Sequence, residues 1–297
     1  MPSRGVKIPL LKSLNQSKED CVVNNDLKAV CKDIRLDTIR CIGHLGVGHI
    51  GGCLSIVELL GVLYFDAMRI DPKNPKMAGR DRLVVSKGHA GPAVYAALAN
   101  RGYFDKSWLL TLNQSGTNLP SHCDMNRTPG VDMTAGSLGQ GFSCAAGIAL
   151  GSKLEGDGAI IYAIVGDGES QEGQIWEAAM FAAAKKLDNL ICFTDYNKLQ
   201  IDDSVANVCD IAPLADKWRA FGWNVIEVEN GNDVKAVKAA VDEARKLVGS
   251  GKPTQVILHT VKGCGVSFIE EAGAANHNMN LSPEQTEAAL REVEGAC

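Results

Sequence analysis

An apolar run that ends in Gly-Asp-Gly is the feature that most constrains the fold of this chain. Residues 159–165 are apolar and rich in β-branched side chains, which is typical of a strand buried on both faces. Gly166-Asp167-Gly168 ends the run, and residues 169–187 then show the periodicity of a helix. A second apolar strand is predicted at 189–194, directly before Asp195-Tyr196-Asn197. This order predicts a parallel sheet with the two polar motifs at its carboxyl edge, where open α/β sheets bind ligands.

The side chains at these two strand ends match the ligands that magnesium prefers. Asp167 offers a carboxylate and Asn197 an amide oxygen, and free backbone carbonyls are further hard oxygen donors. Gly166 and Gly168 allow the backbone to approach a phosphate closely. Gly-Asp-Gly alone could equally be a tight turn with the aspartate as a helix N-cap. Its position between a strand and a helix favours a site for a diphosphate held through a metal.

The remainder of the chain continues the alternation of strands and helices. Helices are predicted at 27–42, 55–68, 90–101, 142–153, 211–221 and 233–248, and strands at 83–86, 224–229 and 254–261. Ser55 and Glu58 are expected to form a capping box for their helix. The predicted fold class is α/β, with a doubly wound, mostly parallel sheet and helices on both faces. Residues 1–26 lack periodicity and are predicted to be an N-terminal tail, which leaves 27–297 as one domain.

Composition narrows the classes of function. The chain has 297 residues and a formal net charge of −5, without the dense lysine and arginine cluster of a nucleic-acid surface, so no nucleic acid is expected as a partner. No apolar run is long enough for a membrane span and the N-terminus lacks the apolar core of a secretory signal, which predicts a cytoplasmic protein without membrane association. The ten cysteines are scattered, without a Cys-x-x-Cys pair, so we expect them to be reduced.

Histidines in or beside glycine-rich segments are the remaining candidate site residues. His49 lies within Gly48-His49-Ile50-Gly51-Gly52, and His89 follows Ser86-Lys87-Gly88. His122 precedes the glycine-rich segment 134–141, which opens a predicted helix and so could bind an anion. From the residues alone, each of these segments could equally serve packing.

Taken together, these motifs resemble those of the transketolases. Gly-Asp-Gly, a helix and a following Asn197 are shared by thiamine-diphosphate enzymes generally. Glu172-Gly173 with Trp176-Glu177-Ala178, the Gly-His-x-Gly around His49, and the Ser-Lys-Gly-His ending at His89 resemble transketolases in particular. The resemblance extends from about Leu27 to Val293, with several independent motifs in family order.

The resemblance implies roles for particular residues. Magnesium, for which calcium or manganese could substitute, would be held by Asp167, Asn197 and the Leu199 carbonyl. Thiamine diphosphate would be bound by His89, Gly136, Ser137, Leu138, Gly166, Asp167, Gly168, Asn197 and His277. The sugar oxygens would be handled by His49, His122 and His277, although the residues around His122 and His277 differ from the family's usual ones. Glu172 would join a carboxylate network between paired active sites.

The implied reaction transfers a two-carbon ketol unit from a ketose phosphate to an aldose acceptor. Full-length transketolases continue into a pyrimidine-binding domain, whose glutamate activates the cofactor, and a C-terminal domain. The chain is therefore expected to be the N-terminal subunit of a split transketolase. We expect it to be inactive alone and to work in a two-plus-two heterotetramer with a C-terminal subunit that carries the pyrimidine-binding domain.

Other functions fit these motifs less well. The α subunit of a 2-oxo acid dehydrogenase shares Gly-Asp-Gly and the asparagine, but not Gly-His-x-Gly with Ser-Lys-Gly-His. A non-catalytic binding subunit would be expected to lose the metal ligands, which are present here. A nucleotide-binding α/β domain should open its first helix with Gly-x-Gly-x-x-Gly or a P-loop, and neither stands there. A specialised ketose stays open as the donor, because most residues that grip the substrate phosphate in the family belong to its other domains.

Overall fold

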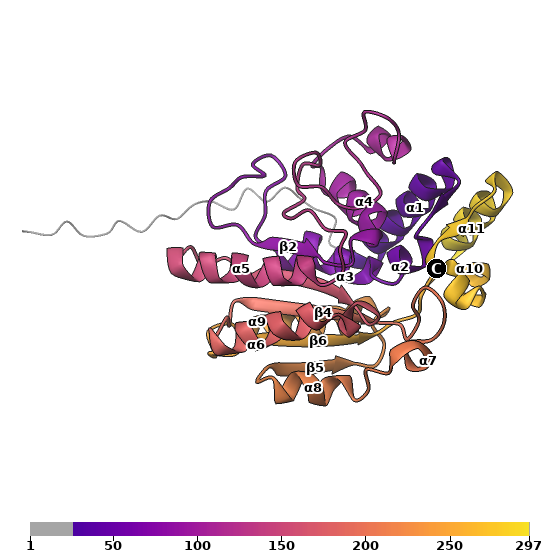
Figure 1. The fold of residues 1–297 in the computed structure, drawn as a ribbon. Helices are drawn as coiled ribbons and strands as arrows, with labels where there is room; N and C mark the ends of the chain where they lie inside the picture. Colours follow the sequence, from indigo (N-terminus) through magenta and orange to yellow (C-terminus); the bar gives the residue numbers. More distant parts are fainter. Residues whose placement is uncertain (1–25, 297) are drawn as a thin grey trace, which may run out of the picture.

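A five-stranded parallel sheet forms the centre of the computed structural model, which describes residues 26–296 (Figure 1). Its strands are β2 (Arg82–Val85), β3 (Ile161–Gly166), β4 (Leu190–Tyr196), β5 (Asn224–Val228) and β6 (Thr254–His259). They lie in the order β2-β3-β4-β6-β5, and all neighbouring pairs are parallel. Non-consecutive neighbours show that the chain crosses over the sheet between strands, as a doubly wound fold requires.

Helices cover both faces of this sheet, which confirms the predicted fold class. One face packs on α5 (Gln140–Glu155), α6 (Gly173–Ala184) and α8 (Leu214–Ala220). The other packs on α1 (Leu27–Leu45), α3 (Val57–Val62), α4 (Gly91–Arg101) and α9 (Val234–Lys246). Strand β3 contributes side chains to the cores on both faces of the sheet. Tyr162 and Ile164 pack in one core, and Ile161, Ala163 and Val165 pack in the other. This two-sided burial explains why the strand is apolar throughout.

Short elements connect these layers and shape the carboxyl edge. They are α2 (Ile50–Leu54), a π-helical turn η1 (Leu63–Ala67), α7 (Val205–Cys209), α10 (Ser267–Glu271), α11 (Pro283–Gly295), and the 3-10 turns η2 (Gly88–Ala90), η3 (Lys106–Thr111), η4 (Glu169–Gln171) and η5 (Gly273–His277). A small antiparallel bridge joins β1 (Val47–Gly48) to β7 (Met279–Asn280). Figure 1 shows α1 and α2 beside α10 and α11, so the two ends of the described chain are neighbours.

The predicted helix at 55–68 is confirmed over residues 57–67, where α3 runs into η1, but its start and its capping box are wrong. Ser55 is the C-cap of α2, and α3 begins without a side-chain cap. The Ser55 hydroxyl instead donates to Asp195 Oδ2 at 2.6 Å, and Glu58 accepts from the Arg35 guanidinium at 2.6 Å. Both side chains are buried. In a buried environment, a hydrogen bond to a charged group elsewhere in the fold stabilises a polar side chain more than a local helix cap does.

Two other boundaries differ from the prediction. The helix expected from residue 169 begins as the turn η4, and the extended backbone of Glu172 separates that turn from α6, for which Glu172 is the N-cap. Helix α1 runs past residue 42 into the predicted glycine-rich loop and ends at Gly46, whose φ of 83° favours glycine. Of the predicted tail, residues 1–25 lie outside the described residues, and Asp26 is the N-cap of α1, accepting from Lys28 N.

No helix within residues 26–296 has the length and apolar character needed to cross a bilayer. Eight cysteines are described and all are free thiols. Five of them are buried, at positions 31, 41, 53, 123 and 192, which agrees with the expectation of reduced core cysteines. Cytoplasmic location and the absence of a nucleic-acid partner stay predictions.

Candidate active site

A pocket of about 350 Å³ lies at the carboxyl ends of β2, β3 and β4. Of the residues predicted to form the site, it is lined by His49, His89, His122, Gly136, Leu138, Gly166, Asp167, Gly168, Glu172, Asn197, Leu199 and His277. A larger cavity, of about 970 Å³, shares none of these residues. We place the candidate active site in the smaller pocket, because that is where the predicted residues meet.

The predicted metal ligands are neighbours at this edge. Strands β3 and β4 pair with Gly166 opposite Asp195, which brings Asp167 beside the turn 197–199. Lys198 has a φ of 66°, a left-handed conformation that is uncommon for a residue with a side chain. The Lys198 amide donates to Asp167 Oδ2, and the Leu199 amide donates to Asn197 Oδ1 at 3.1 Å. The turn thus holds Asp167, Asn197 and Leu199 along one wall of the pocket.

The donor set at this turn fits a hard divalent cation. Burial raises the pKa of Asp167 to about 7, with the Asp195 carboxylate adding to the shift. The hydrogen bonds to the Asp167 carboxylate within residues 26–296 come from two backbone amides, so a cation would supply the charge that this buried group lacks. The same residues contain no group of three or more His, Cys, Asp or Glu arranged for a metal. One carboxylate, one amide oxygen and one carbonyl suit magnesium better than a softer metal.

Four histidines face one another across the pocket. His49 lies with its ring centroid 5.5 Å from His89, 5.8 Å from His122 and 5.3 Å from His277, and His89 lies 5.0 Å from His277. The β1–β7 bridge brings His49 and His277 together, because its register places Gly48 opposite Met279. His44, which the sequence left without a role, is exposed on α1 and does not line the pocket.

All four of these imidazoles have lowered pKa values. Burial is the main cause for each of them. Neighbouring cations add to it, so that burial with Lys262 lowers the pKa of His277 to about 3, and burial with Lys87 lowers that of His89 well below its ordinary value. The cluster is therefore neutral near pH 7, and each ring can donate one hydrogen bond and accept another.

A buried carboxylate that the sequence did not single out ties two glycine-rich segments together. Glu169 accepts from Ser86 Oγ, from Gly139 N at 2.8 Å and from Gly166 N at 3.0 Å. Ser86 Oγ also accepts from Phe142 N at 2.9 Å, which anchors the start of α5. Gly139 has a φ of 82°, so the turn itself favours glycine. Glu169 therefore positions the segment that carries Gly136 and Leu138 against the Gly-Asp-Gly turn.

We expect Glu169→Ala to lower the free energy of unfolding by about 1–3 kcal/mol, because it leaves buried donors without an acceptor. Urea denaturation followed by circular dichroism measures the change. Glu169→Gln keeps one side-chain carbonyl and should lose less. A Glu169→Ala midpoint equal to that of the unmodified chain would show that these hydrogen bonds contribute nothing to stability.

A buried ion pair underlies the pocket. Lys87 is 1% exposed and donates to Asp195 Oδ2 and, at 2.9 Å, to Gly52 O. Burial alone would raise the pKa of Asp195, but Lys87 and the hydroxyls of Ser55 and Thr260 outweigh it and hold that pKa below its ordinary value. Gly52 makes this arrangement possible, because a Cβ at that position would meet His89 Nε2 at 3.1 Å and Lys87 Nζ at 3.5 Å.

Lys262 is a second cation of the pocket. Its ammonium lies 3.4 Å from the Leu199 carbonyl oxygen and 3.3 Å from His277 Nδ1. Burial and Lys87 lower the pKa of Lys262 to about 8. In the sequence Lys262 stood out only as part of a turn after a strand, and its partners lie far along the chain. Lys262 joins the predicted metal ligands to the histidine cluster.

Two predicted residues differ in their placement. Ser137 is exposed and does not line the pocket, although its neighbours Gly136 and Leu138 do. Glu172 lines the pocket from the N-cap of α6 rather than from the first helical turn. The sequence missed Lys87, Glu169 and Lys262 as site residues, together with Gln171, Gln200, Ile201 and Asp202 at the pocket rim.

Comparison with known proteins shows the family of this chain. Residues 27–295 match the family model for the transketolase thiamine diphosphate-binding domain. The chain therefore belongs to the transketolase family, which confirms the resemblance found in its motifs. Transketolase from Leishmania mexicana superposes on it with a TM-score of 0.83 at 29% identity, covering 90% of this chain and 41% of that one.

Two curated relatives are similar over nearly their whole length. The 6-deoxy-6-sulfo-D-fructose transketolase subunit SqwG of Clostridium sp. (strain MSTE9) is 55% identical over 269 residues, 91% of this chain and 96% of that protein. An apulose-4-phosphate transketolase subunit of Actinobacillus succinogenes is 42% identical over 246 residues, 83% of this chain and 87% of that protein.

Proposed function

We propose that this chain is the cofactor-binding subunit of a transketolase that moves a two-carbon ketol unit from a ketose with an anionic terminus to an aldose acceptor. The observation that carries the proposal is one pocket lined by four neighbouring histidines together with Asp167, Asn197 and Leu199. Thiamine diphosphate, held with magnesium by residues of this pocket, would supply the carbanion chemistry that ketol transfer needs.

The chain's own residues would hold the diphosphate through a bound metal ion, through a lysine and a histidine, and through close contact with the backbone at a glycine. Asp167, Asn197 and the Leu199 carbonyl bind the magnesium ion. The ammonium of Lys262 is close enough to the Leu199 carbonyl to contact phosphate oxygens bound there. Gly168 allows the backbone to approach the diphosphate closely, and a larger residue would not fit there, because its Cβ would meet the Gln200 side chain at 3.0 Å. The His89 imidazole, which burial and Lys87 keep neutral, donates a hydrogen bond to the diphosphate.

The histidines would act on the sugar. His49, His122 and His277 are less buried than His89 and line the same pocket. Neutral imidazoles can donate to a carbonyl or hydroxyl oxygen and accept its proton, work that contributes roughly 10²–10⁴-fold to a rate. Glu172 lines the same pocket at the N-cap of α6, and we propose it for the carboxylate network between paired sites.

A separate subunit would complete the active site. Both curated relatives are named as subunits, which supports a partner that brings the pyrimidine-binding domain. Helix α6 offers that partner an apolar contact, because Met180 is 60% exposed and Phe181 39% exposed, and the same helix begins at the pocket with Glu172. A partner seated on α6 would therefore reach the pocket. A two-plus-two heterotetramer would pair two such sites.

Mixing the two subunits tests this proposal. We expect ketol transfer only when the chain, a C-terminal transketolase subunit, thiamine diphosphate and magnesium are all present. Met180→Glu should weaken the assembly, measured by analytical ultracentrifugation, and lower activity at dilute protein. Full turnover by the chain alone would contradict the proposal, and so would no turnover in a verified complex with bound cofactor.

The donor is proposed from the relatives. The higher identity to the 6-deoxy-6-sulfo-D-fructose subunit favours a ketose with a terminal sulfonate, while the apulose-4-phosphate subunit points to a phosphate. We expect the complex to have a higher kcat/KM for 6-deoxy-6-sulfo-D-fructose than for fructose 6-phosphate, with glyceraldehyde 3-phosphate as the acceptor. The reverse order would leave the transketolase proposal intact and assign a phosphorylated donor.

A further inference from the structure

A second cavity, of about 970 Å³, opens at the opposite edge of the sheet from the candidate active site. Its walls come from the segment 73–82 before and at the start of β2, the loop 125–133, and the carboxyl half of α5. It shares no lining residue with the active-site pocket. We call it the basic cleft. A volume near the upper end of the range for small-molecule sites is enough for a ligand of nucleotide size.

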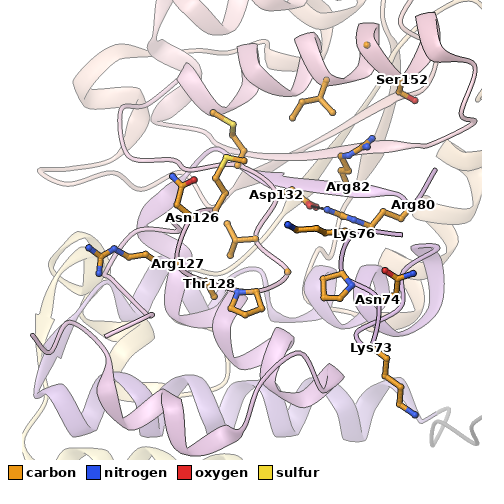
Figure 2. Close-up of a pocket in the computed structure, with 18 of the residues that line it drawn as sticks. Lys73, Asn74, Lys76, Arg80, Arg82, Asn126, Arg127, Thr128, Asp132 and Ser152 are labelled. Carbon is orange, nitrogen blue, oxygen red and sulfur yellow. Dashed lines mark hydrogen bonds and ion pairs between the residues drawn. The ribbon is translucent and has the colours of Figure 1, made fainter. Parts of the chain in front are cut away.

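Positive charge gathers in the basic cleft although the chain as a whole carries −5. Five lining residues are Lys or Arg and two are acidic: Lys73, Lys76, Arg80, Arg82 and Arg127 against Asp132 and Glu155. Figure 2 shows Arg80, Arg82 and Lys76 around Asp132, with Asn126 and Arg127 across the hollow. Clefts lined by one sign of charge concentrate ions of the other sign.

The cations of the cleft are held in place but are only partly neutralised. The Arg80 guanidinium pairs with Asp132 and donates to the Asp81 carbonyl at 3.1 Å, and Asp132 is fixed in turn by Leu83 N at 2.8 Å. Arg82 lies 3.8 Å from the Asp157 carboxylate, beyond hydrogen-bond distance. Within residues 26–296, neither Lys73 nor Lys76 forms an ion pair. Arg127 pairs with Asp124 at 3.6 Å. Lys73 and Lys76 are thus available to an anion from outside, and Arg82 is held only by a long ion pair.

One side of the cleft is apolar. Val131, Met133 and Ile148 line it as partly buried side chains that pack on the two cores, and Met125 is 47% exposed. Exposure of such a surface to water is unfavourable, so a ring or hydrocarbon group that covers it would bind favourably. The cleft therefore combines an apolar wall with a cationic rim.

We propose that the basic cleft binds an organic anion of nucleotide size, with a phosphoryl group on the cations and an apolar or ring portion on the methionine-lined wall. Guanidinium groups bind phosphate oxygens in pairs of hydrogen bonds, and lysines add point charges. Arg80 and Arg82 suit the first role, because a guanidinium has five N–H donors and each arginine keeps some of them free beside its carboxylate partner. Lys73 and Lys76 suit the second. This function is separate from ketol transfer and does not depend on it.

Isothermal titration of the full chain with ADP, without metal, tests the proposal. We expect one site whose affinity falls at least about tenfold in Lys73→Glu/Lys76→Glu, because charge-assisted hydrogen bonds are lost and like charge replaces them. Arg82→Gln should weaken binding as well. Lys252→Glu makes one such charge reversal on an exposed loop outside the cleft and should bind ADP like the unmodified chain, whereas Lys73→Glu alone should weaken binding. Unchanged melting temperatures confirm that the variants fold.

Two further titrations distinguish the basic cleft from the active-site pocket and test its apolar wall. Excess thiamine diphosphate and magnesium should leave ADP binding unchanged; if they abolish it while the cleft variants bind normally, ADP occupies the active site and the proposal is wrong. Inorganic pyrophosphate should bind more weakly than ADP, and equal affinity would overturn the role of the apolar wall. Absence of ADP binding to the unmodified chain would overturn the proposal altogether.

Discussion

Asp167→Asn is expected to abolish metal-dependent binding of thiamine diphosphate while leaving the fold intact. The change removes the one carboxylate from the proposed ligands and keeps a side chain of the same shape between Gly168 N and Lys198 N. Loss of affinity should exceed about 100-fold, since even partners outside the ligand shell typically cost 10–100-fold. Titration calorimetry with thiamine diphosphate and magnesium measures it, and melting temperature with and without these ligands gives a second readout.

Glu243→Gln is the matched control for this prediction. It makes the same chemical change on the exposed face of α9, far from the pocket, and should bind the cofactor normally. Cofactor binding to Asp167→Asn with unchanged affinity and unchanged dependence on magnesium would place the metal elsewhere or remove it from the site.

Lys87→Met should lower the free energy of unfolding by about 3–5 kcal/mol, because it leaves a buried carboxylate without its cation. Asp195 would keep hydrogen bonds from Ser55, Asn197 and Thr260, but these are neutral donors. The pocket should suffer too, since Asn197 Nδ2 is held by Asp195 at 3.1 Å. Urea denaturation measures the stability, and the magnesium dependence of cofactor binding measures the effect on the site.

Lys238→Met provides the comparison for the buried pair. Lys238 pairs with Asp66 and Asp242 on the surface, where an ion pair is worth about 0–1 kcal/mol. Equal shifts of the denaturation midpoint in Lys87→Met and Lys238→Met would contradict the prediction. They would show that burial of the Lys87–Asp195 pair does not increase its contribution to stability.

Local pattern predicts the centre of this fold well. The unit from β3 to β4 is recognisable because a strand buried on both faces must be apolar throughout, and because glycine and a polar residue mark where it stops. The capping box predicted at the start of the helix 55–68 is wrong, although Ser55 and Glu58 have the residue types of one. Their partners, Asp195 and Arg35, are chosen by tertiary contact, which no local pattern reports.

The candidate site shows the same division. Parallel strands bring their carboxyl ends to one edge, so the meeting of Asp167 with Asn197 follows from topology. The histidines are located through motifs that resemble a family. Lys87 and Glu169 stand inside those motifs without a predicted role, because their partners lie 108 and 83 residues away, at Asp195 and Ser86. Whether a charged residue is buried, and which residue is its partner, depends on the tertiary fold and cannot be predicted from the local sequence.

The β1–β7 bridge sets an order for making this protein. Gly48, next to His49, pairs with Met279, so the first histidine of the pocket is placed by the last strand within residues 26–296. During synthesis the sheet can form as its strands emerge from the ribosome, but the wall made by His49 and His277 closes only after translation has passed residue 280. A released chain truncated before Met279 would keep all five strands of the sheet and lose the partner of Gly48, which leaves this wall of the pocket open.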